Sequence, residues 1–184
     1  MKTTSIDPAK ASGVVVWLDG ELAQVWTLRD ATAAECRKKG LGSDGVALVQ
    51  RLPDGSQGAP SLSPRRDALR MLCMGAGVVV EESMGASQKT VAQLGERRGY
   101  IRALCDELGA RFVAVNTSEW RRVVGEHFGV TFPRDSELSK ALAVKLVRER
   151  FGWVCSHDEA DAMLVGLWAW LTRTWERVQA NGGV

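Results

Sequence analysis

Long hydrophobic runs and clusters of cysteine or histidine are missing from this 184-residue sequence. No apolar stretch approaches the roughly 20 residues of a membrane helix, and the opening MKTTSIDPAK lacks the apolar region of a secretory signal. The four cysteines never form a Cys-x-x-Cys pair and there are only two histidines, which argues against a zinc site. We therefore expect a cytoplasmic protein that contacts no membrane and keeps its cysteines as free thiols.

An excess of charge of one sign is also absent, because 24 lysines and arginines are balanced by 22 aspartates and glutamates, for a net charge of +2. The basic residues are nevertheless clustered. Such clusters suit a polyanion such as nucleic acid, although many are only solvated helix faces. The clusters comprise Arg65, Arg66 and Arg70; Arg97, Arg98 and Arg102; Arg121 and Arg122; and Lys140, Lys145, Arg148 and Arg150.

The pattern of apolar residues and turn formers predicts an α/β fold. Residues 3–7 form a predicted strand, and apolar runs on either side of Asp19 and Gly20 predict a hairpin, because both turn residues tolerate a positive φ. The β-branched run in residues 77–82 predicts a central strand buried on both faces. A helix over 87–108, a strand over 111–115 and helices over 118–128, 136–151 and 156–179 follow. We expect a single domain over residues 1–184 whose mixed sheet carries helices on both faces.

Residues 30–62 carry the weakest secondary-structure signals in the sequence. A short helix over 31–39 and a strand over 46–52 fit the pattern, and residues 53–60 are rich in turn formers and predict a loop. Ser63 and Pro64 then predict the start of a helix that runs to about Met74, with the serine as N-cap and the proline at the first helical position. Residues 30–62 therefore look like an insertion with no assigned place in the predicted fold.

Four acidic residues lie at the ends of predicted core elements. Asp7 ends the first strand, Glu81 is near the end of the 77–82 strand, and Asp158 and Asp161 lie three apart near the start of the last helix. A carboxylate at the tip of a buried strand is costly unless it is paired or binds a cation. Several converging carboxylates predict a site for Mg²⁺ or Mn²⁺, which bind hard oxygen ligands, clamp phosphate oxygens and activate water.

Each acid also has an ordinary structural explanation. Asp7 precedes a proline and can shape a turn, and Asp158 gains stability from the helix N-terminus, whereas Asp161 lies deeper in the helix and is harder to dismiss. Glu81 and Glu82 compete for one role because neighbours on a strand face opposite ways, and strand alternation favours Glu81.

The start of the last predicted helix has a capping signal. Ser156 and Glu159 fit a capping box, in which the glutamate reaches back to the serine amide, so we expect a structural role for Glu159. His157 is either a ligand or proton carrier beside the acids or, more simply, a surface histidine.

Several segments, in this order, resemble the RuvC-type Holliday junction resolvases. SIDPAKASGVVV resembles the family's opening Asp-Pro-Gly motif, with Ala9 in place of the glycine, and VVVEE resembles the strand that carries its catalytic glutamate. LGERRGYI resembles the helix after that strand, SEWRRVVG the family's basic segment, and DEADAMLVGLW its closing acidic helix. The resemblance spans residues 3–30 and 77–170. Residues 30–62 depart from it, and the loop between Glu81 and Leu94 is slightly shorter than in the cellular enzymes. Together these departures suggest a compact phage or mobile-element version.

The resemblance implies an RNase H-like fold, two Mg²⁺ ions and a homodimer that cuts opposed strands of a four-way DNA junction. It implies that the catalytic metal ligands are Asp7, Glu81, Asp158 and Asp161. It also implies a phosphate contact by Lys140, which lies where the family has a lysine near the scissile phosphate. The candidate DNA-binding residues are Arg97, Arg98, Arg121, Arg122, Lys140 and Met84. Met84 is either a wedge between bases or a packing residue.

Other classes of function stay open at this stage. A related RNase H-fold nuclease that acts on hybrid, flap or single-stranded nucleic acid would use the same four acids. A non-catalytic DNA-binding relative would be expected to lose at least one of them. An actin-like or sugar-kinase ATPase also opens with an Asp-rich hairpin, but it needs a second lobe and glycine-rich phosphate loops, for which we find no pattern.

Overall fold

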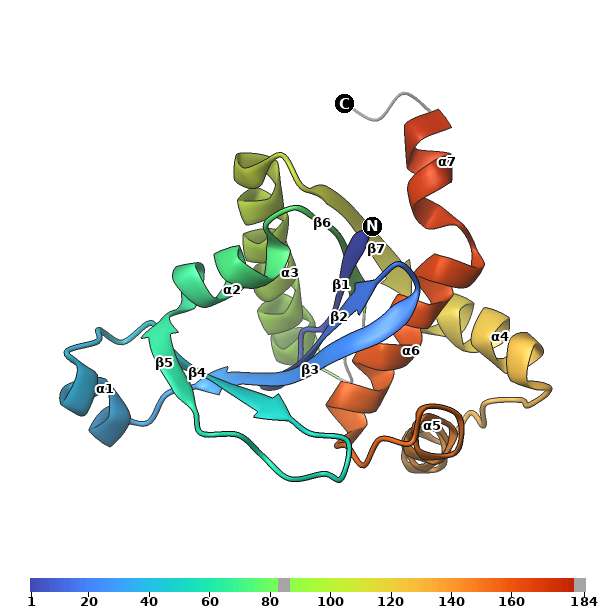
Figure 1. The fold of residues 1–184 in the computed structure, drawn as a ribbon, viewed down its shortest axis with the longest axis horizontal. Helices are drawn as coiled ribbons and strands as arrows, with labels where there is room; N and C mark the ends of the chain where they lie inside the picture. Colours follow the sequence, from blue (N-terminus) through green and yellow to red (C-terminus); the bar gives the residue numbers. More distant parts are fainter. Residues whose placement is uncertain (83–86, 181–184) are drawn as a thin grey trace.

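The computed structural model describes residues 1–82 and 87–180, and a seven-stranded sheet forms the centre of this part of the chain (Figure 1). The strands are β1 (Lys2–Asp7), β2 (Ala11–Leu18), β3 (Glu21–Asp30), β4 (Gly45–Arg51), β5 (Ser61–Pro64), β6 (Ala76–Glu82) and β7 (Arg111–Asn116). Their order across the sheet is β5-β4-β3-β2-β1-β6-β7. The first five strands pair antiparallel, and β6 pairs in parallel with both β1 and β7, so the sheet is mixed as predicted.

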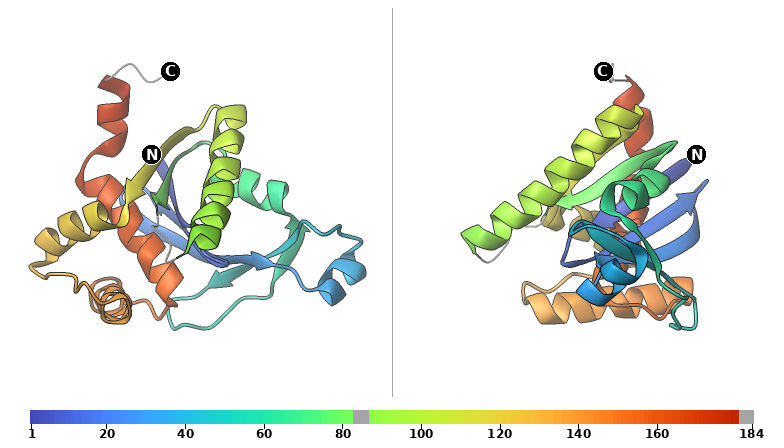
Figure 2. Two further views of the ribbon diagram at one scale, coloured as in Figure 1. Left: turned by 180° about the vertical axis from the view of Figure 1, so that it is seen from behind. Right: turned by 90° about the vertical axis from the view of Figure 1, so that its left-hand side faces the viewer.

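Helices cover both faces of the sheet (Figures 1 and 2). They are α1 (Ala33–Lys39), α2 (Arg65–Cys73), α3 (Gln88–Leu108), α4 (Thr117–Phe128), α5 (Ser136–Phe151), α6 (His157–Leu171) and α7 (Thr174–Ala180). One hydrophobic cluster joins α2 and α3 to one face, and a second joins α4, α5 and α6 to the other. The predicted α/β architecture with helices on both faces is therefore confirmed.

The hairpin at the start of the chain follows from its turn residues. Asp19 and Gly20 adopt φ values of 50° and 86°, and Leu18 pairs directly with Glu21 across β2 and β3. Two consecutive residues with positive φ give a turn whose twist matches that of the flanking strands. The predicted two-residue turn is confirmed.

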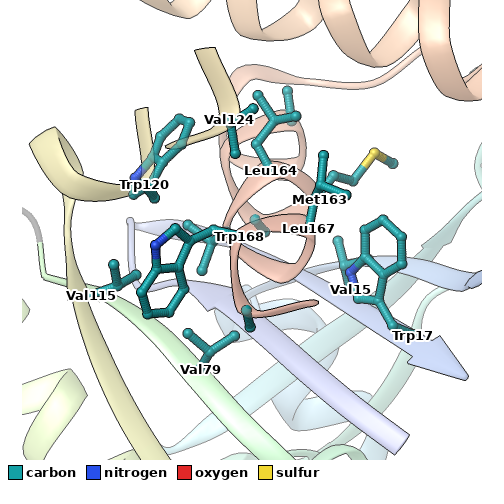
Figure 3. Close-up of a cluster of buried hydrophobic side chains, with 14 of the residues drawn as sticks. Val15, Trp17, Val79, Val115, Trp120, Val124, Met163, Leu164, Leu167 and Trp168 are labelled. Atoms are coloured by element: carbon teal, nitrogen blue, oxygen red, sulfur yellow. The ribbon is translucent and has the colours of Figure 1, made fainter. Parts of the chain in front are cut away.

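Helix α6 runs through the larger hydrophobic cluster, and every residue from Glu159 to Ala169 is buried. Met163, Leu164 and Leu167 face the sheet residues Val15 and Val79 and the helix α4 (Figure 3). A helix that is apolar on all sides belongs inside a core. The first two turns of α6, which carry the acidic residues, are thereby fixed against the ends of the central strands.

Two glycines let α6 approach the sheet closely. A Cβ atom on Gly166 would lie 2.1 Å from Nε1 of Trp17, and one on Gly13 would lie 2.1 Å from the carbonyl oxygen of Asp158. Both distances are far below van der Waals contact, so any other residue would push the helix away from β2. Gly13 in particular sets the distance between the start of α6 and the end of β1.

The insertion at residues 30–62 extends the same sheet. The helix and strand predicted within it are confirmed as α1 and β4, but β5 was not predicted. Ser63 pairs with Val46 inside β5, and Pro64 occupies the N-cap position of α2 without a side-chain hydrogen bond. The prediction that Ser63 caps the helix was therefore wrong, because Ser63 is part of strand β5 and pairs with β4.

The predicted helix over 156–179 is also wrong in its length. It is interrupted at Thr172 and Arg173, where Arg173 has a φ of 50° and the Thr172 hydroxyl donates to the carbonyl oxygen of Trp168 at 2.8 Å. The change of direction brings Trp175 into the core, where its ring lies against Gly77. Within residues 1–82 and 87–180, no helix combines the length and apolarity that crossing a bilayer requires.

Candidate metal centre

Three buried carboxylates meet at one edge of the sheet. The parallel register of β1 and β6 pairs Ile6 with Val80, so the next residues along, Asp7 and Glu81, end the two strands side by side. Asp161 reaches the same point from α6. One oxygen from each carboxylate lies within 4.8 Å of the others, and the three residues are only 4–7% exposed.

Burial and repulsion from neighbouring carboxylates disfavour the charged forms of Asp7 and Asp161. Burial is the main cause that raises the pKa of Asp7 well above its usual value, and the neighbouring carboxylates, Glu81 first, add to it. Burial also raises the pKa of Asp161 to about 7, with Glu81 adding to the rise and Arg121 opposing it. Such a group is unfavourable without a compensating cation.

The donor set fits a divalent metal ion. Oδ1 of Asp161 is buried and has no hydrogen-bond partner among the described residues, and Arg121 approaches the other oxygen only to 3.8 Å. Thr117, at the start of α4, donates to Oε1 of Glu81 at 2.6 Å and fixes that carboxylate. Three hard oxygen donors on rigid elements, one of them unpartnered, are suited to Mg²⁺ or Mn²⁺.

Asp158 lies one turn before Asp161 on α6 and is half-buried. It is outside the group of three, but its charge contributes to the raised pKa of both Asp7 and Asp161. Its own pKa is raised by burial, while the charge of Lys140 opposes that shift. Asp158 is therefore close enough to the other acids to serve the same site from its rim.

The structure separates the two glutamates that end β6. Glu81 is 4% exposed and points to Asp7 and Asp161. Glu82 is more exposed and forms an ion pair with Arg98 from α3. Strand alternation therefore favoured the glutamate that the fold turns inward.

Comparisons with known proteins bear on this arrangement. Neither models of protein families nor curated proteins gave a match to the sequence. Among solved structures, the chain is similar to Thermus thermophilus RuvC, with a TM-score of 0.51 and 15% identity over 96% of this chain and 97% of that chain. It is also similar to T. thermophilus RuvC in complex with a Holliday junction substrate, with a TM-score of 0.51 and 16% identity over 100% and 98% of the two chains. The chain has a RuvC-like fold.

In this RuvC-like fold the acids form the floor of a cleft of about 1500 Å³. Four of the predicted DNA-binding residues line it, namely Arg97, Arg121, Arg122 and Lys140. Further basic side chains that we did not single out from the sequence also line it, namely Lys10, Lys89 and Arg134. Asp30 and Glu126 line the cleft as well, and Glu126 pairs with Arg122 at 2.9 Å. The cleft therefore combines the buried acids with a surrounding surface on which basic side chains outnumber acidic ones.

The basic residues of the cleft differ in how they are held. The Arg121 guanidinium lies 5.2 Å from the Trp120 ring and 5.8 Å from the Phe132 ring, so its position is fixed by stacking. Arg97 donates to the carbonyl oxygens of Pro8 and Ala9, which ties α3 to the loop after β1. Arg121 is thus held at the floor beside the acids, and Arg97 braces the loop that follows Asp7.

The other residues predicted for the site differ in where they lie relative to the cleft. Arg98 is paired with Glu82 and is absent from the described residues that line the cleft. Lys140 lies 3.6 Å from Glu137 on the exposed side of α5 and still reaches the cleft. His157 is exposed and outside the group of three acids. Met84 lies outside the described residues.

Proposed function

We propose that this protein is a metal-dependent endonuclease that cuts DNA at four-way junctions. The observation that carries the proposal is the group of three buried carboxylates within 4.8 Å of one another at the floor of a basic cleft. Asp7 and Asp161 each have a raised pKa within this group, and strongly shifted carboxylates of this kind are common at functional sites. The resemblance of the sequence to the RuvC-type resolvases, and the RuvC-like fold, support this chemistry over that of a binding protein.

Asp7, Glu81, Asp158 and Asp161 would hold two Mg²⁺ ions, for which Mn²⁺ would substitute. Bound ions of this kind supply a Lewis acid for the phosphate and lower the pKa of water. The carboxylates fix where those charges sit, and Thr117 keeps Glu81 oriented through its hydrogen bond.

The basic side chains of the cleft would hold the DNA backbone. Arg121 is stacked on aromatic rings beside Asp161, so it offers a positioned positive charge to a phosphate at the floor. Lys140 and Arg97 line the same cleft. Because these contacts are to phosphates, binding should weaken steeply as salt concentration rises.

Two copies of the chain would act together on one junction. The described residues contain one group of acids of this kind, and resolving a junction requires cuts in two opposed strands. One solved structure with the same fold is that of T. thermophilus RuvC in complex with a Holliday junction substrate, which supports branched DNA as the substrate here. A homodimer with one centre per subunit is the simplest arrangement that meets this need.

The test is cleavage of labelled four-way junction, flap, RNA–DNA hybrid and linear duplex in Mg²⁺. We expect preferred cutting of the junction, and loss of cutting with retained junction binding in Asp7→Asn, Asp161→Asn and Glu81→Gln. Glu82→Gln is the matched control and should cut normally, because Glu82 faces away from the acids. Undiminished cutting by the first three variants would refute the metal centre. Preference for hybrid or linear duplex would refute junction resolution but retain the nuclease.

A further inference from the structure

Glu159 is a fully buried carboxylate on the same turn of α6 as the acids of the metal centre, between Asp158 and Asp161. Its oxygens accept hydrogen bonds from the Ser156 amide at 2.7 Å and from the Thr27 hydroxyl. The capping box predicted from the sequence is present. The capping box satisfies part of this carboxylate, but a fully buried charge also needs a partner of opposite charge.

That partner is Arg51, the last residue of β4. Nε of Arg51 donates to both carboxylate oxygens of Glu159, at 3.2 and 3.1 Å, so one N–H is shared between the two oxygens. Nη1 of Arg51 also donates to the carbonyl oxygen of Gly55 at 2.8 Å. The arginine therefore connects the first turn of α6 to the loop between β4 and β5.

Backbone contacts strengthen the same connection. The Val154 amide, just before α6, donates to the carbonyl oxygen of Pro53 at 3.0 Å. Gly55 approaches Val154 so closely that a Cβ atom there would lie 2.8 Å from Cγ1 of the valine. Residues 53–55 thus form a support for the start of α6, on the inserted part of the chain that the sequence left without a role.

We propose that Arg51, acting through Glu159, is a positioning residue for the metal centre. The inference rests on the proposed metal-dependent function. The pair fixes the first turn of α6, which carries Asp158, and the helix continues from this turn directly to Asp161, which lies beside Asp7. Partners that orient metal ligands typically change metal affinity by about 10- to 100-fold when they are removed.

Positioning and simple charge compensation predict opposite results at this pair. Arg51→Met leaves Glu159 as an additional uncompensated negative charge near the metal ions. Charge alone would therefore tighten the binding of a divalent cation. If Arg51 positions the turn, the same variant weakens binding, because the buried glutamate must move toward water and takes the first turn of α6 with it.

The experiment measures Mn²⁺ affinity by titration calorimetry, without DNA, alongside stability in EDTA. We expect Arg51→Met to weaken Mn²⁺ binding by about tenfold or more. Arg51→Lys keeps the charge and so guards against a failure to fold. It loses the guanidinium that contacts both Glu159 and the carbonyl oxygen of Gly55, and it should weaken binding by about threefold or more. Adding Glu159→Gln to Arg51→Met removes the stranded charge and should restore part of the affinity.

Arg29→Met is the matched control, because it breaks the ion pair between Arg29 on β3 and Glu35 on the inserted helix α1, and Arg29 forms no hydrogen bond or ion pair with the described residues of α6. It should leave Mn²⁺ affinity unchanged. If Arg51→Met and Arg51→Lys lower stability in EDTA but bind Mn²⁺ as tightly as wild type, or more tightly, the positioning role is overturned while the metal centre stands. If the wild-type protein binds no Mn²⁺, or if Asp161→Asn binds it equally well, both the proposed metal centre and this inference are refuted.

Discussion

Replacing Asp161 with asparagine should stabilise the metal-free protein at pH 8. The pKa of Asp161 is about 7 in the folded protein, against the ordinary value of 3.8, and burial is the main cause. A carboxyl group whose pKa is raised by folding binds its proton more tightly in the folded state. Its contribution is therefore neutral below about pH 4, and the folded protein loses stability as the pH rises through 7.

The size of the effect follows from the shift. The difference between the two pKa values corresponds to about 4 kcal/mol above pH 7, at roughly 1.4 kcal/mol for each unit. The shift already includes the opposing attraction of Arg121, whose Nη2 lies 3.8 Å from the carboxylate, and the asparagine amide must itself stay buried. We therefore expect a gain of about 2–4 kcal/mol at pH 8 and of less than half that amount at pH 5.

The assay is urea unfolding in EDTA between pH 5 and pH 8. Wild type should become less stable across this range, and Asp161→Asn should lose less stability. Asp44→Asn, the same chemical change at an exposed residue, is the control and should follow wild type. A variant that is less stable than wild type at pH 8, or one whose advantage does not depend on pH, would refute the account of a strained acidic centre.

The remaining predictions concern metal binding and packing. Mg²⁺ at 100 times its dissociation constant should stabilise wild type by about 2.7 kcal/mol and Asp161→Asn by much less, as measured by the shift in the urea midpoint. Thr117→Val should lower stability by about 1 kcal/mol in EDTA and weaken Mn²⁺ binding in calorimetry, because it removes the 2.6 Å hydrogen bond to Glu81. Gly13→Ala should destabilise the protein by about 1–3 kcal/mol in urea and slow junction cutting, because its Cβ would displace the start of α6, whereas Gly95→Ala, where the added Cβ meets nothing within 4 Å, should not.

The central part of the site could be predicted from the sequence because its signals are local. An aspartate after a short strand, a glutamate in phase with a β-branched run and a spaced pair of aspartates on a helix each define a position and a direction. The parallel pairing of β1 and β6 then places Asp7 beside Glu81. Each of these steps depends on a repeating backbone geometry that holds in any protein.

The parts that could not be predicted depend on contacts between distant segments. Arg51 and Glu159 are 108 residues apart, and the local sequence around either residue does not predict their contact. Arg97 and Arg98 are adjacent in sequence, yet only the first lines the cleft, because Glu82 on another element pairs with the second. Ser63 carried a valid capping signal, but pairing with β4 outweighed it.

The burial of α6 on all sides has a consequence for how the protein is made. This helix follows all seven strands of the described residues and packs on β1, β2 and β6, so the part of the sheet face that includes Val15 and Val79 stays uncovered until α6 leaves the ribosome. A nascent chain at that stage exposes a large apolar surface and is open to aggregation or chaperone binding. The same step brings Asp161 to Asp7 and Glu81. The closing of the core and the completion of the acidic centre are therefore a single event, and a partly made chain holds no assembled site.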